Sequence, residues 1–142
     1  MTRLRRTILC IDDHWNALIA RKMLLESKGY RVLESTDAEE GFDLFLGHAV
    51  DVVVVDYQMP GVGGDVIATK MKKSKPYVPI VLLSSFGPLP GHKLTAIDVF
   101  LTKSQEPKAL LPCLQVLMNR RPKPFFHRWF DHWKSRNQAA RP

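Results

Sequence analysis

The stretch Thr7-Ile8-Leu9-Cys10-Ile11-Asp12-Asp13 is a short apolar run that ends in two acids. The same arrangement recurs at Val52–Val55, which is followed by Asp56. Continuous β-branched runs of this length are typical of parallel strands that are buried on both faces of a sheet. Both runs are therefore predicted to be buried strands whose carboxyl ends carry acidic side chains.

Two later apolar runs also end in polar residues. Pro79–Leu83 is followed by Ser84, and Ile97–Leu101 is followed by Thr102 and Lys103. Because the ligand site of an open α/β sheet lies beyond the carboxyl ends of its strands, we expect these groups to meet the three acids at one edge. A cluster of carboxylates, a hydroxyl and an ammonium group is the main indication of function in the sequence.

The segments between the apolar runs carry helical signals. Apolar residues recur at helical spacing after the first run, and Gly29 is a stop signal. A short strand is expected at 30–34, and Ser35-Thr36-Asp37 offers an N-cap for a helix that runs to about Leu46. Further helices are expected from about Asp65 to the lysines at 70–73 and over 106–118. The apolar residues of the first helix are Leu18, Ile19, Met23, Leu24 and Leu25, and the last helix is predicted to bury Leu110, Leu111, Leu114, Leu117 and Met118.

The segment 86–95 interrupts this alternation of strand and helix. It holds two prolines and two glycines in ten residues. Such a segment is too short and too broken for a normal crossover helix, and one or two turns near 91–95 are the most that fit. We therefore expect the fourth crossover helix to be short or missing.

The length of 142 residues suits one domain with a sizeable core, and we divide the chain into a domain at 1–119 and a tail at 120–142. The net charge of +7 is mostly a property of the tail, because residues 119–142 hold seven basic side chains and one acidic side chain. The charge is therefore no sign of nucleic-acid binding by the domain. Cys10 and Cys113 lack metal-type spacing and are interpreted as core residues. The histidines His14, His48 and His92 are interpreted as surface or loop residues, since their spacing is not that of metal ligands.

The tail is predicted to be a basic amphipathic helix, because Phe126, Trp129, Phe130 and Trp133 recur at helical spacing. It could cover the domain, join a second copy into a homodimer, lie on an acidic membrane surface or enter a protein or nucleic-acid groove. It is too short for a helix-turn-helix domain, so sequence-specific DNA binding is not expected. The apolar run near the basic N-terminus is too short for a signal peptide, and a cytoplasmic location is expected.

The polar residues at the strand ends resemble the receiver domain of response regulators in two-component systems. The matching positions are Asp12-Asp13, the loop from Asp56 to Gly64, Ser84 and Lys103, and the similarity covers about residues 5–120. The resemblance implies a flavodoxin-like, doubly wound five-stranded parallel sheet in the order 2-1-3-4-5. It also implies that a histidine kinase or phosphotransfer protein phosphorylates Asp56, and that a downstream protein recognises the phosphorylated form.

The resemblance further assigns roles around a Mg²⁺ ion. Asp12, Asp13, Asp56 and the backbone carbonyl of Gln58 would surround the ion, while Ser84 and Lys103 would contact the phosphoryl oxygens. Physical arguments agree, because close carboxylates repel unless a cation intervenes, and Mg²⁺ prefers oxygen ligands. A carboxylate can act as a covalent nucleophile, and a positioned ammonium can stabilise the transferring phosphoryl group. Asp13 is the better candidate for direct ligation, with Asp12 acting partly through water.

Each of these residues also has an ordinary structural interpretation. Asp12 or Asp13 could be a helix N-cap, Ser84 a turn residue and Lys103 a solvated lysine. Their joint occurrence at successive strand ends favours the receiver site. Phe100 lies three residues before Lys103, where receivers carry an aromatic that rotates inward, and with Ser84 it is a candidate switch. Its alternative is a plain strand aromatic.

Two features depart from the family pattern. Receivers usually have a proline with a cis bond after the lysine, whereas Ser104 follows Lys103 here. A cis bond without proline costs about 2.5–4 kcal/mol, so we expect either a rearranged trans loop or a strained one. The segment 86–95 also lacks the helical face that usually forms part of the output surface, which predicts unusual signal output.

Two rival functions stay open. The first is a pseudo-receiver that binds partners without using phosphate, although all the site residues are retained. The second is an aspartyl-phosphate phosphohydrolase on a related scaffold. Such enzymes usually need a second aspartate two residues after the nucleophile, where this chain has Gln58. We therefore expect no enzymatic activity beyond the chain's own phosphorylation and dephosphorylation.

Overall fold

The computed structural model describes residues 5–120 of the chain. The predicted tail helix and its possible contacts with a second copy, a membrane or a groove lie outside the described residues. Among the described residues, no helix combines the length and the apolar character that crossing a membrane requires.

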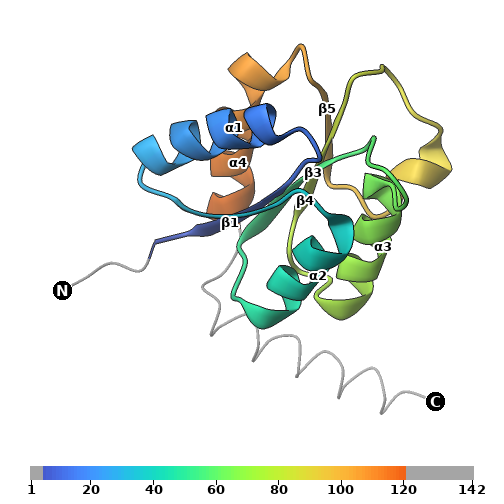
Figure 1. Cartoon of the computed structure of the whole chain (residues 1–142), viewed down its shortest axis with the longest axis horizontal. Helices are drawn as coiled ribbons and strands as arrows, with labels where there is room; N and C mark the ends of the chain where they lie inside the picture. Colours follow the sequence, from blue (N-terminus) through green and yellow to red (C-terminus); the bar gives the residue numbers. More distant parts are fainter. Residues whose placement is uncertain (1–4, 121–142) are drawn as a thin grey trace.

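Five parallel strands form a single sheet in the order β2-β1-β3-β4-β5, with helices on both faces (Figure 1). The predicted doubly wound, flavodoxin-like α/β fold with strand order 2-1-3-4-5 is therefore confirmed. Each apolar run of the sequence lies on a strand, within two residues of the predicted bounds. The strands are β1 Thr7–Ile11, β2 Arg31–Ser35, β3 Val52–Asp56, β4 Ile80–Ser84 and β5 Val99–Thr102.

Two apolar cores lie on the two faces of the sheet, because successive side chains of a strand point to opposite faces. Ile8 and Cys10 of β1 join the core beneath α1 and α4, whereas Leu9 and Ile11 join the core beneath α2 and α3. Figure 1 shows these helix pairs on opposite sides of the sheet. The helices are α1 Trp15–Ser27, α2 Ala38–Gly47, α3 Gly64–Ser74 and α4 Glu106–Arg120.

The ends of the helices follow the local sequence signals. Asp37 caps α2, since its carboxylate accepts a hydrogen bond of 2.9 Å from the Glu40 N–H. Gly29 follows α1 with a φ of 93°, a conformation that favours glycine. Gly64 begins α3 so close to the carbonyl of Asp56 that a Cβ there would overlap that backbone oxygen. This close approach holds the start of α3 against the end of β3.

The buried face of α1 includes only part of its apolar residues. Leu18, Arg21 and Leu25 are buried, whereas the side chains of Met23 and Leu24 are exposed. These three buried positions are three and four residues apart and so form one helical face. The sheet-facing position between the two leucines is filled by Arg21, so not every apolar residue at helical spacing in α1 faces the sheet.

The fourth crossover contains only a short 3-10 helix, η1 at Gly91–Leu94, as predicted. Leu89, Leu94 and Ile97 pack against the core shared by α2 and α3. Lys93 Nζ lies 3.5 Å from Asp65 Oδ2 and 5.7 Å from the centre of the Tyr57 ring. Apolar packing and one lysine thus hold this segment beside α3.

Candidate functional site

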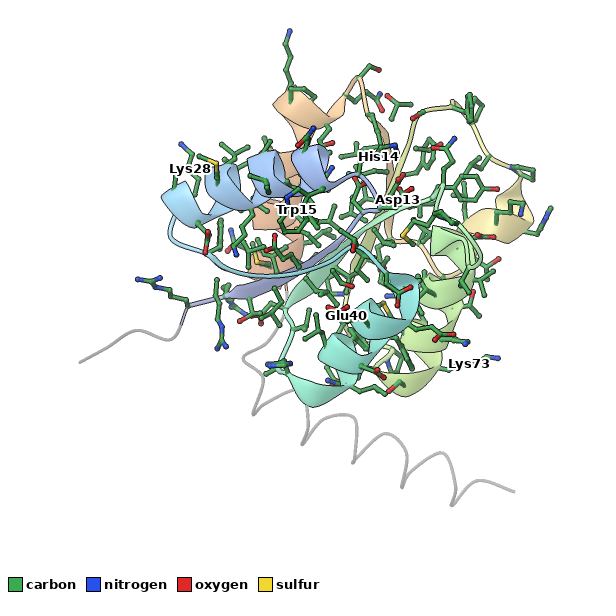
Figure 2. All side chains as sticks on the ribbon, in the orientation of Figure 1. Asp13, His14, Trp15, Lys28, Glu40 and Lys73 are labelled. Carbon is green, nitrogen blue, oxygen red and sulfur yellow. The ribbon has the colours of Figure 1, made fainter. Side chains whose placement is uncertain are left out.

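Two buried carboxylates lie side by side at the carboxyl edge of the sheet. Asp12 follows β1 and Asp56 ends β3, the neighbouring strand, and both side chains are almost fully buried. Asp13 and His14 continue the chain from Asp12 into α1 at this edge (Figure 2). Each of these four residues offers a ligand atom, and the four atoms all lie within 4.8 Å of one another. The sequence-predicted acids are therefore brought together.

Lys103 supplies positive charge to this cluster, as the sequence predicts. Its Nζ lies 3.3 Å from Asp56 Oδ2 and 3.6 Å from Asp12 Oδ2. The backbone N–H of Lys103 donates a hydrogen bond of 2.8 Å to the Ser84 carbonyl, which fixes the residue to the end of β4. The ammonium group is thus held between the two buried carboxylates.

The loop after Lys103 adopts a trans arrangement, since the described residues contain no cis peptide bond. The hydroxyls of Thr102 and Ser104 lie 2.9 Å apart, and Gln105 Oε1 accepts a hydrogen bond of 2.9 Å from the Thr102 N–H. Serine in place of the family's proline therefore leaves Lys103 within reach of Asp56, with hydrogen bonds holding the loop.

Ser84 and Phe100 lie next to the cluster on β4 and β5. Ser84 is fully buried one residue beyond the partner of Asp56 in the sheet, and its Oγ accepts a hydrogen bond of 3.1 Å from the Phe86 N–H. Phe100 pairs with Leu82 and packs, partly buried, against the core beneath α2 and α3. Their predicted role as a switch stays a prediction.

Gln58 connects two loops around the site. Its backbone N–H donates a hydrogen bond of 3.4 Å to Asp56 Oδ1, and its side-chain Oε1 accepts one of 3.2 Å from the Ser85 N–H. The loop after β3 is thereby linked to the loop after β4. Metal ligation by its backbone carbonyl also stays a prediction.

Arg21 and Glu106 belong to the same network, although sequence reasoning missed them. The buried guanidinium of Arg21 contacts both oxygens of Glu106, at 2.7 and 3.1 Å, and lies 3.3–3.4 Å from Asp12 Oδ2. Arg21 thus bridges the site to the first turn of α4. The sequence signal for a buried Arg21 was its spacing, which places it between Leu18 and Leu25 on one face of the helix.

His14 is part of the cluster as well as being exposed. Its Nδ1 lies 3.3 Å from Asp12 Oδ1 and 3.2 Å from Asp13 Oδ1, although 66% of its side-chain surface is accessible. The prediction of a surface residue without a metal-ligand position was therefore incomplete. The signal missed was its place directly after Asp12-Asp13. His14 is also the N-cap residue of α1, so neither aspartate is the cap.

Comparison with known proteins agrees with this arrangement. A family model described as response regulator receiver domain matches residues 8–115. The chain belongs to this receiver family. Receivers of this kind are the signalling modules of two-component systems, which is the class that the residues at the strand ends indicate.

Two curated relatives show how much of their length this receiver matches. The phosphate regulon transcriptional regulatory protein PhoB of Pseudomonas aeruginosa is 26% identical over 121 residues, which cover 81% of this chain and 52% of that protein. The transcriptional regulatory protein RprY of Bacteroides fragilis is 29% identical over 119 residues, with coverages of 81% and 50%. The chain thus spans about half the length of these relatives.

Solved structures share the fold of this receiver. A response regulator receiver domain protein from Clostridium thermocellum is 30% identical, with a TM-score of 0.75 and coverages of 81% of this chain and 95% of that one. The response regulator TrrA of Thermotoga maritima, solved in complex with Mg²⁺-BeF, is 27% identical, with a TM-score of 0.74 and coverages of 79% and 98%.

Burial sets the electrostatics of Asp56. It raises the pKa of this carboxyl from 3.8 to about 6, with a further upward contribution from the Asp12 carboxylate. Lys103 and the hydrogen bond from Gln58 oppose this shift. The net increase in pKa means that Lys103 and this hydrogen bond only partly offset the burial of negative charge.

One oxygen of the cluster has no hydrogen-bond partner. Asp13 Oδ1 is a buried atom without such a partner among the described residues. A buried carboxylate oxygen without a donor is costly, and a hard cation would satisfy it. The donor set of this site therefore fits a divalent ion that prefers oxygen ligands.

Without divalent ions, Asp56→Asn is expected to stabilise the receiver at neutral pH by roughly 1–2 kcal/mol, since one pKa unit corresponds to about 1.4 kcal/mol. The folded-state pKa of about 6 exceeds the ordinary 3.8, so the protein folds more favourably with Asp56 protonated than with Asp56 charged. That stabilising contribution of the protonated form is lost as pH rises through about 6. Denaturation in EDTA at several pH values measures this effect. A variant that is less stable than wild type at neutral pH would contradict it.

Arg21→Met should lower the free energy of unfolding by about 3 kcal/mol or more, because it leaves carboxylates unpaired in a largely buried network. The double variant Arg21→Met/Glu106→Leu should recover much of that loss. Lys22→Met is the matched control, since Lys22 pairs with Glu34 at a partly exposed position and should cost less than about 1 kcal/mol. Equal losses in Arg21→Met and the control, measured by urea denaturation, would show that the network does not stabilise the fold.

Proposed function

We propose that Asp56 accepts a phosphoryl group from a phosphohistidine of a histidine kinase or phosphotransfer protein, in a Mg²⁺-dependent phosphorelay. The observation that carries this proposal is the position of Lys103, whose ammonium lies between Asp56 and Asp12 at the mouth of an acidic cluster. A downstream protein would then recognise the phosphorylated form through protein contacts.

The chemistry assigns a role to each residue. An Asp56 carboxylate oxygen attacks phosphorus, an O–P bond forms, the N–P bond of the donor breaks, and the donor histidine keeps the electron pair and takes up a proton. Lys103 stabilises the negative charge of the transferred group. The Ser84 hydroxyl would give up its hydrogen bond with the Phe86 N–H and donate one to a phosphoryl oxygen. Phe100 would turn inward as the Ser84 hydroxyl moves.

A divalent ion would be held by Asp12, Asp13, Asp56 and the backbone carbonyl of Gln58. Bound Mg²⁺ supplies charge neutralisation at the phosphoryl oxygens. Asp12 Oδ2 faces Arg21 and Lys103, so Oδ1 is the oxygen of Asp12 left to face the ion. Asp13, with its unpartnered Oδ1, is the candidate for direct ligation.

The rival functions receive less support. A pseudo-receiver would have no need to keep Lys103 at the two buried carboxylates. A phosphohydrolase would need a general acid where Gln58 lies, and the side chain of Gln58 is engaged with Ser85. Turnover of a phosphomonoester that is lost in Asp56→Asn would revive the second rival.

Beryllofluoride mimics a phosphoryl group on a carboxylate and tests this site directly. Wild type should give a saturable change in Trp15 fluorescence that requires Mg²⁺, because Trp15 is exposed and follows Asp13 and His14. Asp56→Asn should abolish the response and Lys103→Met should weaken it at least about tenfold, whereas Lys108→Met, on the exposed side of α4, should leave it unchanged.

Trp15→Phe assigns the signal, because the chain has three tryptophans. This variant should lose the fluorescence change while still binding beryllofluoride in calorimetry. No response of wild type by either method would favour the pseudo-receiver.

A further inference from the structure

We propose that His14 is a ligand of the ion at this site, and that its imidazole strengthens binding of a first-row transition cation such as Mn²⁺ more than binding of Mg²⁺. The inference rests on the metal site proposed above and adds to it a nitrogen donor. His14 is the only histidine in the cluster that the described residues form around Asp12, Asp13 and Asp56.

The distances fit ligands of one ion. Two donor atoms that each lie about 2.1 Å from a metal are about 3.0 Å apart at a right angle and about 3.4 Å apart at a tetrahedral angle. His14 Nδ1 lies 3.3 Å from Asp12 Oδ1 and 3.2 Å from Asp13 Oδ1. Its 4.0 Å separation from Asp56 Oδ2 is close to the roughly 4.2 Å expected for donors on opposite sides of the same ion.

The contact between His14 and Asp13 does not serve as a hydrogen bond. Asp13 Oδ1 is buried and has no hydrogen-bond partner among the described residues, although the imidazole nitrogen is only 3.2 Å away. Two lone-pair donors that approach closely without a hydrogen bond are arranged like neighbouring ligands of a cation. This oxygen belongs to the cluster itself, and an ion between these groups would satisfy it.

The backbone keeps His14 at the site. Its N–H donates a hydrogen bond of 2.9 Å to Asp12 Oδ1, and the residue is the N-cap of α1 in an extended conformation. Its side chain is 66% exposed, so water reaches the His14 side of the cluster. A fixed backbone at this position lowers the cost of ordering the His14 side chain when an ion binds.

The donor chemistry sets the selectivity. Mg²⁺ prefers oxygen donors only, whereas an imidazole nitrogen favours first-row transition ions. With three carboxylates and one imidazole, the site remains suited to Mn²⁺, which accepts oxygen ligands in octahedral geometry. Removal of the imidazole should therefore weaken the binding of Mn²⁺ much more than the binding of Mg²⁺.

Electron paramagnetic resonance of Mn²⁺ bound to the full chain tests the proposal. Wild type should show a nitrogen coupling from a coordinated imidazole, and His14→Gln should lose that coupling. The Mn²⁺ dissociation constant should rise about tenfold or more in His14→Gln, while the Mg²⁺ constant, measured by competition, changes less than about threefold. His92→Gln, at an exposed position on η1, is the matched control and should match wild type.

The variants separate failure of this inference from failure of the proposed function. One outcome would overturn only the role of His14: wild type binds Mn²⁺ without a nitrogen coupling, and Asp13→Asn abolishes that binding. The phosphoacceptor site would then remain supported. Equal weakening of Mn²⁺ binding and Mg²⁺ binding in His14→Gln would also overturn the role of His14. Absence of both Mg²⁺ and Mn²⁺ binding by wild type would overturn the inference and the proposed metal site together.

Discussion

The placement of two buried carboxylates side by side, Asp12 and Asp56, is the constraint on which the rest of the site depends. Buried charges of like sign are unfavourable unless cations or hydrogen bonds offset them. Lys103 contacts both groups from β5's end, and Arg21 contacts Asp12 from α1. The raised pKa of Asp56 shows that this compensation is incomplete, which leaves the site poised for a further cation.

The fold creates this constraint and stabilises it. Adjacent parallel strands bring Asp12 and Asp56 to one edge, and the contact between Gly64 and the Asp56 carbonyl holds α3 against it. Arg21 then ties Asp12 to Glu106 at the start of α4. The packed helices therefore do more than cover the sheet, because α1 and α4 hold Arg21 and Glu106 next to Asp12.

The sequence predicted the features that depend on local pattern and strand order. The apolar runs, the N-cap signal at 35–37 and the broken fourth crossover are local, and the meeting of Asp12, Asp56 and Lys103 follows from parallel strands ending at one edge. Arg21 was missed because its burial depends on a partner, Glu106, that lies 85 residues away in the chain. The place of His14 in the cluster was missed because its position directly after Asp12-Asp13 was not weighed, and the trans loop at Ser104 depends on side-chain hydrogen bonds that spacing does not encode.

Chemical mapping of the phosphorylated residue tests the central claim most directly. The full chain would be incubated with Mg²⁺ and acetyl phosphate, treated with borohydride to reduce any aspartyl phosphate to homoserine, and examined by peptide mass spectrometry. The account predicts Mg²⁺-dependent reduction at Asp56 alone, with none in Asp56→Asn. Unmodified Asp56 in a folded, Mg²⁺-bound protein, or modification at another aspartate in its place, would contradict it.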